Sequence, residues 1–498
     1  MYFRHDTDNR LLEIHTEDFE PVSQVKVTDA AAQCIELPIL KTESGAEGLI
    51  LRTDASQLEL WNPDHPVLYT LYAGKQSCRF GFSALKTEGS SAILLNGVPI
   101  YLRGYIRGIV AHDHPNMTGR SRKEAARKNI RQAKKYGFNS VRFHSTVPSP
   151  EFVEAADEEG LLIHMEIGFA YEYNAQGEKQ NLSLNNTRWR ETIRQYRNHP
   201  SVAIFCIGNE MHNSGHLPAV RALYEEGRRL APGKLIMDNS GWGEFDRMTS
   251  DIFAQHIAYF FPYGHHAKMF EKEDPWLLNG SATDAPMDTA LHGGVHGTVH
   301  RAAIPVPPVI AHEACHYIEV PDYEELNRKF DQFCARVGAE YLSENGIVKP
   351  RYLTELPQLI RRKGLLHKLP DYIAASQQFK MFALKTYWEK CRLSALCGLE
   401  MLQFADCLKY ENKNGIVDCF DDDKYIPAEW MRRFNSDAVL LADMEKSLFF
   451  YGDELQGSLF ISDFLPEPEI TDGSLVLRLI RDDGREKELY SGKNFVVP

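Results

Sequence analysis

From about residue 98 to residue 404 the chain repeats one pattern: a short apolar run of strand length, then a longer segment whose apolar positions have helical spacing. The runs interpreted as strands are 98–104, 138–144, 161–166, 202–208, 235–238, 252–256, 309–311 and 399–404. Apolar strands separated by amphipathic helices are typical of a parallel sheet covered by helices. Eight of them predict a central (β/α)8 TIM barrel.

The segments on either side of this region alternate apolar and polar residues instead. Residues 1–88 contain short alternating runs separated by turn clusters, which predicts an immunoglobulin-like β-sandwich domain. Alternation returns after residue 436, over a stretch too short for a complete sandwich of about seven strands. We therefore expect a sandwich domain over 1–88, the barrel over 89–435 and an incomplete C-terminal β-sandwich domain over 436–498.

Two segments interrupt the barrel pattern and lengthen it beyond the usual size of about 250 residues. Residues 274–306 are rich in Gly and His and are interpreted as a loop at the barrel rim, although metal-binding tracts have a similar composition. Residues 320–395 carry long helical patterns with charged faces, which we interpret as solvent-exposed.

Composition and charge narrow the class of function. The chain is 43% hydrophobic and 25% charged, as soluble globular proteins are, and its formal net charge of −13 disfavours nucleic acid or an anionic membrane as partner. No apolar run is long enough to span a bilayer and no signal peptide is visible, so a cytoplasmic location is expected if Met1 is the natural start. The nine cysteines form no C-x-x-C pair, so we expect neither a disulfide framework nor a cysteine zinc site. We also expect no other metal and no cofactor.

Charged and polar residues stand where the predicted strands end. Active sites of (β/α)8 barrels lie at the C-terminal ends of the strands, so these residues are the candidate site. They are Arg107, Arg142, His144, Glu166, Asn209, Glu210, Asp238, His256, Tyr259, Glu313, Gln403 and Asp406. The clearest of these strand ends is the apolar run 202–207, which is followed by Gly208, Asn209 and Glu210. A strand-to-helix turn without a catalytic role is the alternative, because Glu is also favoured in the first turn of a helix.

The segment PPVIAHEACH at residues 307–316 contains H-E-x-x-H, a zinc-peptidase signature when it lies on a helix. Two prolines and the β-branched pair that follows them favour an extended strand. The longer form of the zinc signature would also need Gly in place of Glu319 and His in place of Asp322. We therefore interpret Glu313 as a carboxylate at the end of the seventh strand and set the zinc-peptidase alternative aside.

Glu210 and Glu313 would then face each other across the mouth of the barrel. Most glycoside hydrolases use two carboxyl groups for catalysis. A separation of about 5–5.5 Å between them would predict a retaining reaction, in which one is the nucleophile and the other the acid/base. The nucleophile must stay ionised, and Arg142 and Tyr259 are candidates for keeping it so.

Several motifs together resemble glycoside hydrolase family 2, which contains β-galactosidases, β-glucuronidases and β-mannosidases. The motifs are Asn96-Gly97 with Leu102-Arg103-Gly104, the segment Gly137 to His144, Asp157 to Leu161 with Glu166, Arg197 to Val202 with Gly208-Asn209-Glu210, and Trp61 to Tyr69 with Phe80-Gly81-Phe82. The resemblance covers about residues 60–420.

The resemblance implies roles for individual residues. It makes Glu210 the acid/base and Glu313 the nucleophile, and it assigns the sugar 2-hydroxyl to Asn209. It places His112, Asp113 and His144 in the subsite for the non-reducing sugar. The remaining residues expected to bind substrate are Arg142, Tyr259, His256 and Gln403.

The chain also departs from the family pattern. The jelly-roll domain that usually opens these enzymes is missing, which suggests that Met1 is not the natural start. The nucleophile context is His312-Glu313-Ala314-Cys315 instead of Ser-Glu-Tyr/Phe-Gly, and Leu402-Gln403-Phe404 stands where the eighth strand often has Trp.

Two functions are compatible with these residues. The main interpretation is a retaining, exo-acting β-glycosidase of β-galactosidase type, acting on a glycoside or oligosaccharide. The alternative is a non-catalytic carbohydrate-binding protein on a degenerate barrel. A uronide substrate would need donors for its carboxylate; Asn412-Lys413 is a candidate pair, and a polar turn is the competing interpretation. The sequence leaves the sugar and the oligomeric state open.

Overall fold

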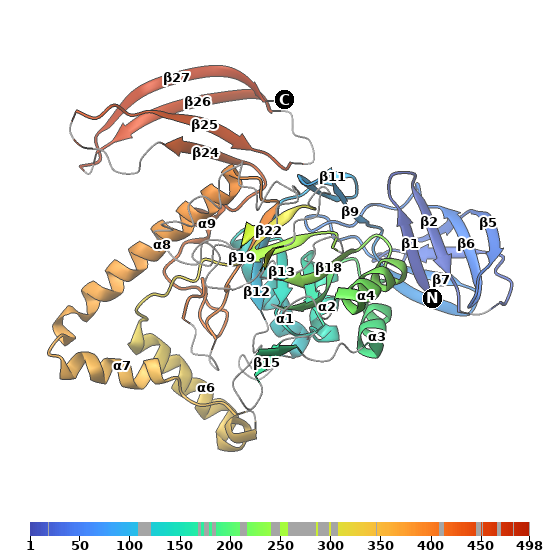
Figure 1. Cartoon of the computed structure of the whole chain (residues 1–498), viewed down its shortest axis with the longest axis horizontal. Helices are drawn as coiled ribbons and strands as arrows, with labels where there is room; N and C mark the ends of the chain where they lie inside the picture. The colour runs from blue at the N-terminus through green and yellow to red at the C-terminus, as the bar shows by residue number, and fades with distance from the viewer. Residues whose placement is uncertain are drawn as a thin grey trace. The chain divides into compact units, whose positions relative to one another are not determined.

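The structure, a computed structural model, describes most of the chain (Figure 1). The described residues are 1–17, 19–107, 121–167, 171–173, 179–181, 186–209, 217–240, 250–256, 285–286, 298–299, 307–344, 346–407, 413–444, 450, 452–465, 470–481 and 483–497. They form two compact units, unit 1 over Met1–Ser436 and unit 2 over Asp437–Pro498.

Unit 1 begins with a sandwich of two four-stranded antiparallel sheets, ordered β1-β2-β6-β5 and β4-β3-β7-β8. The strands are β1 (Tyr2–Asp6), β2 (Leu11–His15), β3 (Val25–Thr28), β4 (Cys34–Leu37), β5 (Ile39–Ser44), β6 (Leu49–Asp54), β7 (Tyr69–Ala73) and β8 (Gln76–Phe80). Alternate residues such as Leu12, Val27, Leu51 and Leu71 are fully buried in one cluster. The alternation in the sequence is therefore the inner face of a sandwich, and the predicted fold of this region is confirmed.

A small three-stranded sheet follows the sandwich and changes the predicted start of the barrel. It has the order β11-β10-β9, with β9 at Leu85–Glu88, β10 at Ala92–Leu95 and β11 at Val98–Pro99. Asn96 and Gly97 link β10 to β11 with φ of 55° and 84°, as a two-residue hairpin turn requires. The predicted strand 98–104 is thus wrong at its beginning, because residues 98–99 pair back onto β10 and the barrel strand starts at Leu102.

The barrel consists of eight parallel strands, drawn from cyan to orange in Figure 1. They are β12 (Leu102–Arg107), β13 (Ser140–Phe143), β14 (Leu162–Glu166), β17 (Val202–Asn209), β18 (Leu235–Ser240), β19 (Phe253–His256), β22 (Val309–Ala314) and β23 (Gly398–Met401). The sheet order β18-β17-β14-β13-β12-β23-β22-β19 follows the chain order, and β12 pairs with both β13 and β23. The first and last strands are therefore neighbours, which confirms the predicted (β/α)8 barrel.

The helices between the strands begin and end at recognisable residues. They are α1 (Arg122–Lys135), α2 (Pro150–Glu159), α3 (Asn186–Tyr196) and α4 (Leu217–Leu230), with the short α9 (Ala428–Arg432) after the last strand. Short paired strands are β15 (Tyr171–Tyr173) with β16 (Lys179–Asn181) and β20 (Ala285–Pro286) with β21 (Thr298–Val299). Ser121 and Glu124 form a capping box on α1, and α2 starts after Ser149 and ends at Gly160 in the left-handed conformation.

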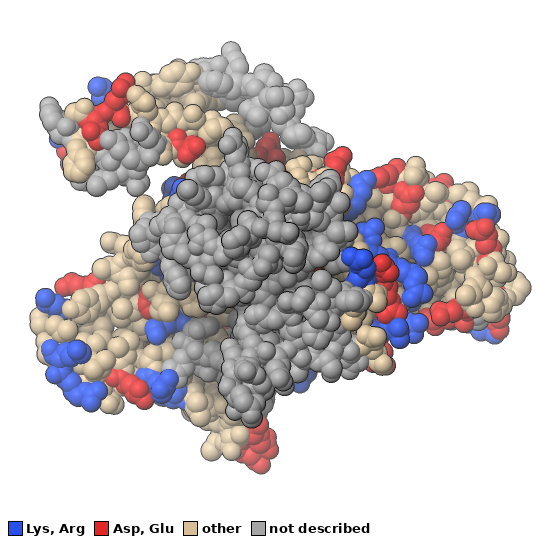
Figure 2. Space-filling model, in the orientation of Figure 1, with Lys and Arg blue, Asp and Glu red and all other residues tan. Residues whose placement is uncertain are grey.

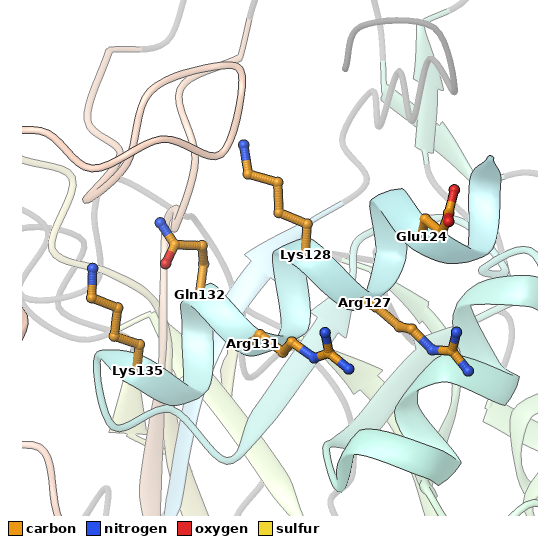
Figure 3. Close-up of a pocket in the computed structure, with 6 residues that line it drawn as sticks. All are labelled: Glu124, Arg127, Lys128, Arg131, Gln132 and Lys135. Carbon is orange, nitrogen blue, oxygen red and sulfur yellow. The ribbon is translucent and has the colours of Figure 1, made fainter. Parts of the chain in front are cut away.

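The outer face of α1 is basic and lies between two acidic segments. Six side chains line a hollow of about 710 Å³ along this face: Glu124, Arg127, Lys128, Arg131, Gln132 and Lys135. In Figure 3, Arg127 and Arg131 point to one side of the helix, where they pair with Glu158 and Glu159 of α2. Lys128 and Lys135 point to the other side, where they pair with Asp422 and Asp423. The basic face is thus neutralised within unit 1. In the view of Figure 2, positive and negative side chains are interspersed in the same way.

Three long helices separate β22 from β23, as the pattern over 320–395 predicted. They are α6 (Tyr323–Glu344), α7 (Arg351–Arg362) and α8 (Leu369–Leu393), with a short 3-10 helix, η3 (Leu366–Lys368), before α8. Each helix buries only one side: α6 and α7 share a cluster built on Tyr323, Leu326, Tyr352 and Leu353. Their other residues are largely exposed, which fits the charged faces seen in the sequence.

A buried cluster of four charged residues joins α8 to the loops that follow β22 and β23; we call it the ion cluster. Lys380 Nζ lies 2.6 Å from Glu319 Oε2, and Lys424 contacts Glu319 and, at 3.1 Å, Asp406. Burial raises the pKa of Asp406 to about 6 despite the nearby Lys424, and burial lowers the pKa of Lys380 to about 8 despite Glu319. Asp406, a candidate site residue by sequence, is therefore engaged by the ion cluster.

The raised pKa of Asp406 gives a pH signature. A carboxyl whose folded pKa exceeds its ordinary value of 3.8 contributes stability that is complete below that value and lost as the pH rises through about 6. Urea unfolding of wild type and Asp406→Asn should show the difference in unfolding free energy falling between about pH 4 and pH 6. The pKa of Asp422 is lowered by bonds from Lys128 and Lys329 despite its burial, so the stability difference for Asp422→Asn should be constant above about pH 4 and fall as the pH drops below that value. A pH-independent difference for Asp406→Asn would contradict this assignment.

Unit 2 is built from two antiparallel strand pairs. They are β24 (Val439–Met444) with β25 (Gly457–Ser462), and β26 (Ile470–Ile480) with β27 (Glu486–Val497). The apolar–polar alternation predicted after residue 436 falls on these strands. Several apolar side chains of unit 2 are exposed, among them Leu459, Ile461, Leu479 and Ile480.

Among the residues that the structure describes, no helix combines the length and the apolar character that crossing a bilayer would need.

Candidate active site

The centre of the candidate site is Arg142, whose side chain is fully buried inside the barrel. It comes from β13, where residues alternate between the helices outside and the barrel interior. Arg142 Nε donates to Glu166 Oε1 at 2.7 Å, and Nη1 lies 3.3 Å from Glu313 Oε1. Nη2 donates to Asn209 Oδ1 at 2.9 Å and to the Ser240 hydroxyl at 3.2 Å. One guanidinium therefore fixes side chains from four other strands relative to one another.

Glu313 lies on a strand, so the structure rejects the zinc-peptidase interpretation of the H-E-x-x-H segment. β22 spans Val309–Ala314 and is parallel to its neighbours, so His312 and His316 are not on one face of a helix. Glu313 has a φ of 50° and Cys315 a φ of 62°, and the pairing of β22 with β23 shifts between Ala311 and Ala314. Positive φ is uncommon for residues other than glycine and often marks functional positions. At Glu313 the positive φ occurs in a residue whose carboxylate contacts Arg142, which supports a functional position.

The carboxylate of Glu313 is also held by a histidine. His144 follows β13, and its Nε2 lies 3.0 Å from Glu313 Oε1, while its Nδ1 is 3.9 Å from Glu166 Oε2. Glu313 is 7% exposed, so its surroundings are largely protein. A carboxylate in such a place keeps its charge only when cationic or hydrogen-bonding groups compensate the lost water. Arg142 and His144 are groups of this kind.

Glu166 shows how strongly Arg142 acts in this site. Burial alone would raise the pKa of Glu166, but the charge of Arg142, with smaller contributions from His144 and His164, holds that pKa below its ordinary value. The carboxylate is also bonded to the Ser240 hydroxyl and accepts from the backbone N–H of Ser145 at 2.5 Å. The three carboxylates near Arg142 in turn raise the pKa of the guanidinium against the effect of its burial. The pair is therefore charged on both sides at neutral pH.

The structure brings five of the candidate residues into one cluster: Arg142, His144, Glu166, Asn209 and Glu313. Gln403 is 6% exposed and follows β23, whose end is tied to β22 by a bond from Leu402 N to Ala314 O. The backbone of His256 pairs with that of His312 on the neighbouring strand. Four more of the candidate residues lie outside the described residues: Glu210, His112, Asp113 and Tyr259.

Other strand-end residues lie elsewhere or were missed. Arg107 lies 3.6 Å from Asp421 Oδ1, on the side of the loop after β23. Ser240 was missed because the predicted fifth strand stopped at Asp238, whereas β18 continues to Ser240. Glu400 and its partner His164 were missed because they lie within strands and not at their ends. A charged residue inside an otherwise apolar strand is the signal that could have found them.

Three potential metal ligands cluster below Arg142, but their chemistry does not suit a cation. Ligand atoms of His164, Glu166 and Cys206 all lie within 4.8 Å of one another. Glu166 already pairs with Arg142, whose positive charge would repel an ion bound there. Burial raises the pKa of the Cys206 thiol well above its ordinary value, which opposes formation of the thiolate that binds metals.

The amino-acid sequence of the barrel matches that of a known protein family. Residues 86–275 match the family model for "Glycosyl hydrolases family 2, TIM barrel domain". Over these residues the chain is similar to glycoside hydrolase family 2. The matched segment contains the strands that carry Arg142, His144 and Asn209, whereas Glu313 lies beyond it.

The curated proteins that this chain resembles are named as β-glucuronidases and β-galactosidases. A putative β-glucuronidase of Formosa agariphila is 28% identical over 206 residues, which are 38% of this chain and 23% of the relative. A β-galactosidase of Priestia megaterium is 25% identical over 252 residues, 45% of this chain and 23% of the relative. The matches thus span less than a quarter of either relative.

Solved structures show the same fold. The β-glucuronidase of Lactobacillus rhamnosus superposes with a TM-score of 0.51 at 18% identity, covering 88% of this chain and 67% of that one. The family 2 β-galacturonidase of Eisenbergiella tayi, bound to galacturonate, has a TM-score of 0.50 at 16% identity, covering 85% and 68%.

Proposed function

We propose that this chain is a retaining, exo-acting β-glycosidase of glycoside hydrolase family 2 in which Glu313 is the nucleophile and Glu210 the acid/base. The observation that carries the proposal is the position of Glu313 inside the barrel, 3.3 Å from Arg142 Nη1 and 3.0 Å from His144 Nε2. A nucleophilic carboxylate must be ionised at the moment of attack, and a guanidinium beside it favours the charged form. The alternative, a binding protein on a degenerate barrel, gives no reason for this arrangement.

The reaction follows from the two carboxylates. A Glu313 oxygen attacks the anomeric carbon while the glycosidic C–O bond breaks and Glu210 gives its proton to the leaving oxygen. Glu210 then takes a proton from water, the water oxygen attacks the anomeric carbon, and the ester bond to Glu313 breaks. Two inversions at one carbon give net retention. Arg142 Nη2 donates to Asn209 Oδ1, so the Asn209 amide directs its Nδ2 donors away from the guanidinium, toward a sugar hydroxyl.

For the substrate we propose a neutral β-hexoside, with a galactoside as the first choice. A uronide would need cations for its carboxylate, and Lys413 was the sequence candidate. Its Nζ lies 5.0 Å from the centre of the Tyr352 ring on α7, a cation–π contact that occupies it outside the barrel. The second candidate of that pair, Asn412, lies outside the described residues.

Hydrolysis of a panel of aryl β-glycosides (galactoside, glucoside, mannoside, arabinoside, glucuronide) by wild type and Glu313→Ala tests this proposal. Wild type should cleave one glycoside well, and the variant should lose at least about 10⁴-fold in kcat. Added azide should restore turnover of an activated substrate and give the glycosyl azide of inverted configuration, because azide fills the space of the missing carboxylate.

Glu324→Ala is the matched control, since it removes an exposed glutamate of α6. It should leave kcat unchanged. A folded wild type that cleaves no glycoside in the panel would refute the proposed function, and a Glu313→Ala variant with wild-type activity would refute the role of Glu313.

A further inference from the structure

Two buried ionisable residues lie inside the barrel near Arg142, and the reaction proposed above does not use them. His164 on β14 and Glu400 on β23 are each 2% exposed. His164 Nδ1 lies 2.7 Å from Glu400 Oε1. In the sheet, β13 and β12 separate the two strands, so this contact spans the interior of the barrel and is not a contact between neighbouring strands.

Small residues on the strands between them make room for this contact. A Cβ atom at Gly104 on β12 would lie 2.9 Å from the backbone oxygen of Leu399, 2.9 Å from Ser140 Oγ and 3.0 Å from Glu400 Cγ. Gly104 pairs with Ser140 on one side and with Glu400 on the other. The absence of a side chain at residue 104 therefore lets Glu400 reach across to His164.

Glu400 is also a competitor for Arg142. Its second oxygen, Oε2, lies 3.9 Å from Arg142 Nε, beyond hydrogen-bond range but close for two opposite charges in a buried site. Arg142 is already shared between Glu166 at 2.6 Å and Glu313 at 3.3 Å. Of these two carboxylates, Glu313 has the longer contact with Arg142. Its ion pair with the guanidinium would therefore be weakened most if Glu400 moved toward Arg142.

Among the described residues, His164 makes one side-chain hydrogen bond. Its Nδ1 contacts Glu400, while its buried Nε2 has no hydrogen-bond partner there. An ionised Glu400 can only accept, so the ring carries its hydrogen on Nδ1. Within the described part of the chain, the hydrogen bond to Glu400 is therefore the interaction that fixes the orientation of the His164 ring.

We propose that His164 is a positioning residue that holds Glu400 away from Arg142 and so leaves the guanidinium to Glu313 and Glu166. The proposal rests on the proposed function, because its effect on catalysis passes through the nucleophile. Without His164, the nearest cation for Glu400 is Arg142. Glu400 would then draw Arg142 from Glu313, and the nucleophile would lose the partner that keeps it ionised and oriented.

A double-mutant cycle tests this on the glycoside that wild type cleaves best. His164→Leu should lower kcat about tenfold or more with KM within about threefold, because no residue proposed to bind substrate is changed. Glu400→Gln, which removes the competing charge, should stay within about threefold of wild type. The double variant should recover to the level of Glu400→Gln, an interaction that two merely structural changes would not show. His164→Gln, whose amide can donate to Glu400, should retain more activity than His164→Leu.

His199→Leu is the matched control, because His199 Nδ1 bonds Asp157 Oδ2 at 2.6 Å outside the candidate site. It should leave kcat unchanged. A double variant as slow as His164→Leu, or a His164→Leu variant with wild-type kcat, would overturn the proposal.

A crystal structure of His164→Leu separates this proposal from the proposed function, since it needs no activity. It should show Glu400 in direct contact with Arg142 and the Arg142–Glu313 contact lengthened. If Glu400 stays where it is, the proposal fails even when wild type is active. If wild type cleaves no glycoside, the structure of the variant still decides whether His164 holds Glu400. Should His164→Leu not fold, His164→Ala with and without Glu400→Gln provides the same comparison, because alanine cannot donate to Glu400.

Discussion

Arg142→Lys is expected to lower kcat/KM by about 10²–10³-fold on the glycoside that wild type cleaves best, the loss typical of removing a preorganised charged donor. The guanidinium of Arg142 reaches Glu166, Glu313 and Asn209 at once from a fixed plane. Lysine keeps one positive charge but places it at a single point on a flexible stem. It cannot bridge all of these groups, so Glu313 loses orientation while the charge of the site is unchanged. Steady-state kinetics on purified variants measure the effect.

Arg103→Lys is the control for this prediction. Arg103 is also buried and donates from Nε to Gly137 O at 2.8 Å, but it takes no part in the Glu313 cluster. We expect its kcat/KM to stay within about threefold of wild type. Equal losses in the two variants would mean that any buried arginine of the barrel matters to the same extent and that Arg142 has no special role.

Lys380→Met is expected to destabilise unit 1 by about 3–5 kcal/mol, the usual consequence of removing one member of a buried ion pair. Lys380 is fully buried and contacts Glu319 Oε2 at 2.6 Å and Gly415 O at 2.8 Å. Methionine fills a similar volume but leaves the Glu319 carboxylate with less compensation in a buried place. The free energy of unfolding from urea titration, followed by a probe in unit 1, measures the loss.

Lys385→Met on the same helix is the matched control. Lys385 pairs with Glu389 one turn along α8 at 2.6 Å, but its side chain is 48% exposed. Exposed pairs of this kind contribute about 0.3–0.5 kcal/mol, so the variant should be nearly as stable as wild type. A Lys380→Met variant no less stable than Lys385→Met would show that the ion cluster adds little to the fold.

The sequence predicted the barrel well because its strands are continuous apolar runs with turn or helix signals on both sides. The error at the first strand has a local cause. Asn96-Gly97 between alternating apolar residues is a strong hairpin signal, and it takes residues 98–99 into a separate sheet. Reading the apolar run 98–104 as one element ignored that turn.

Only part of the site could be predicted, because the remaining contacts depend on the register between strands. Residues at strand ends, such as Arg142, Asn209 and Glu313, can be read from the chain because barrel topology brings those ends together. The contact between His164 and Glu400 depends on how two non-neighbouring strands are staggered and on the space left at Gly104. Neither quantity can be read from one strand alone. The same limit hid Ser240, which became visible only once β18 was seen to extend past Asp238.

The missing side chain at Gly104 has an evolutionary consequence. A Cβ atom there would meet the backbone oxygen Leu399 O at 2.9 Å as well as Glu400 Cγ at 3.0 Å. The spacing of β12 and β23 therefore requires glycine at residue 104, whatever side chain residue 400 carries. In an alignment of relatives that keep this spacing, the column of Gly104 should stay constant even where the columns of His164 and Glu400 vary.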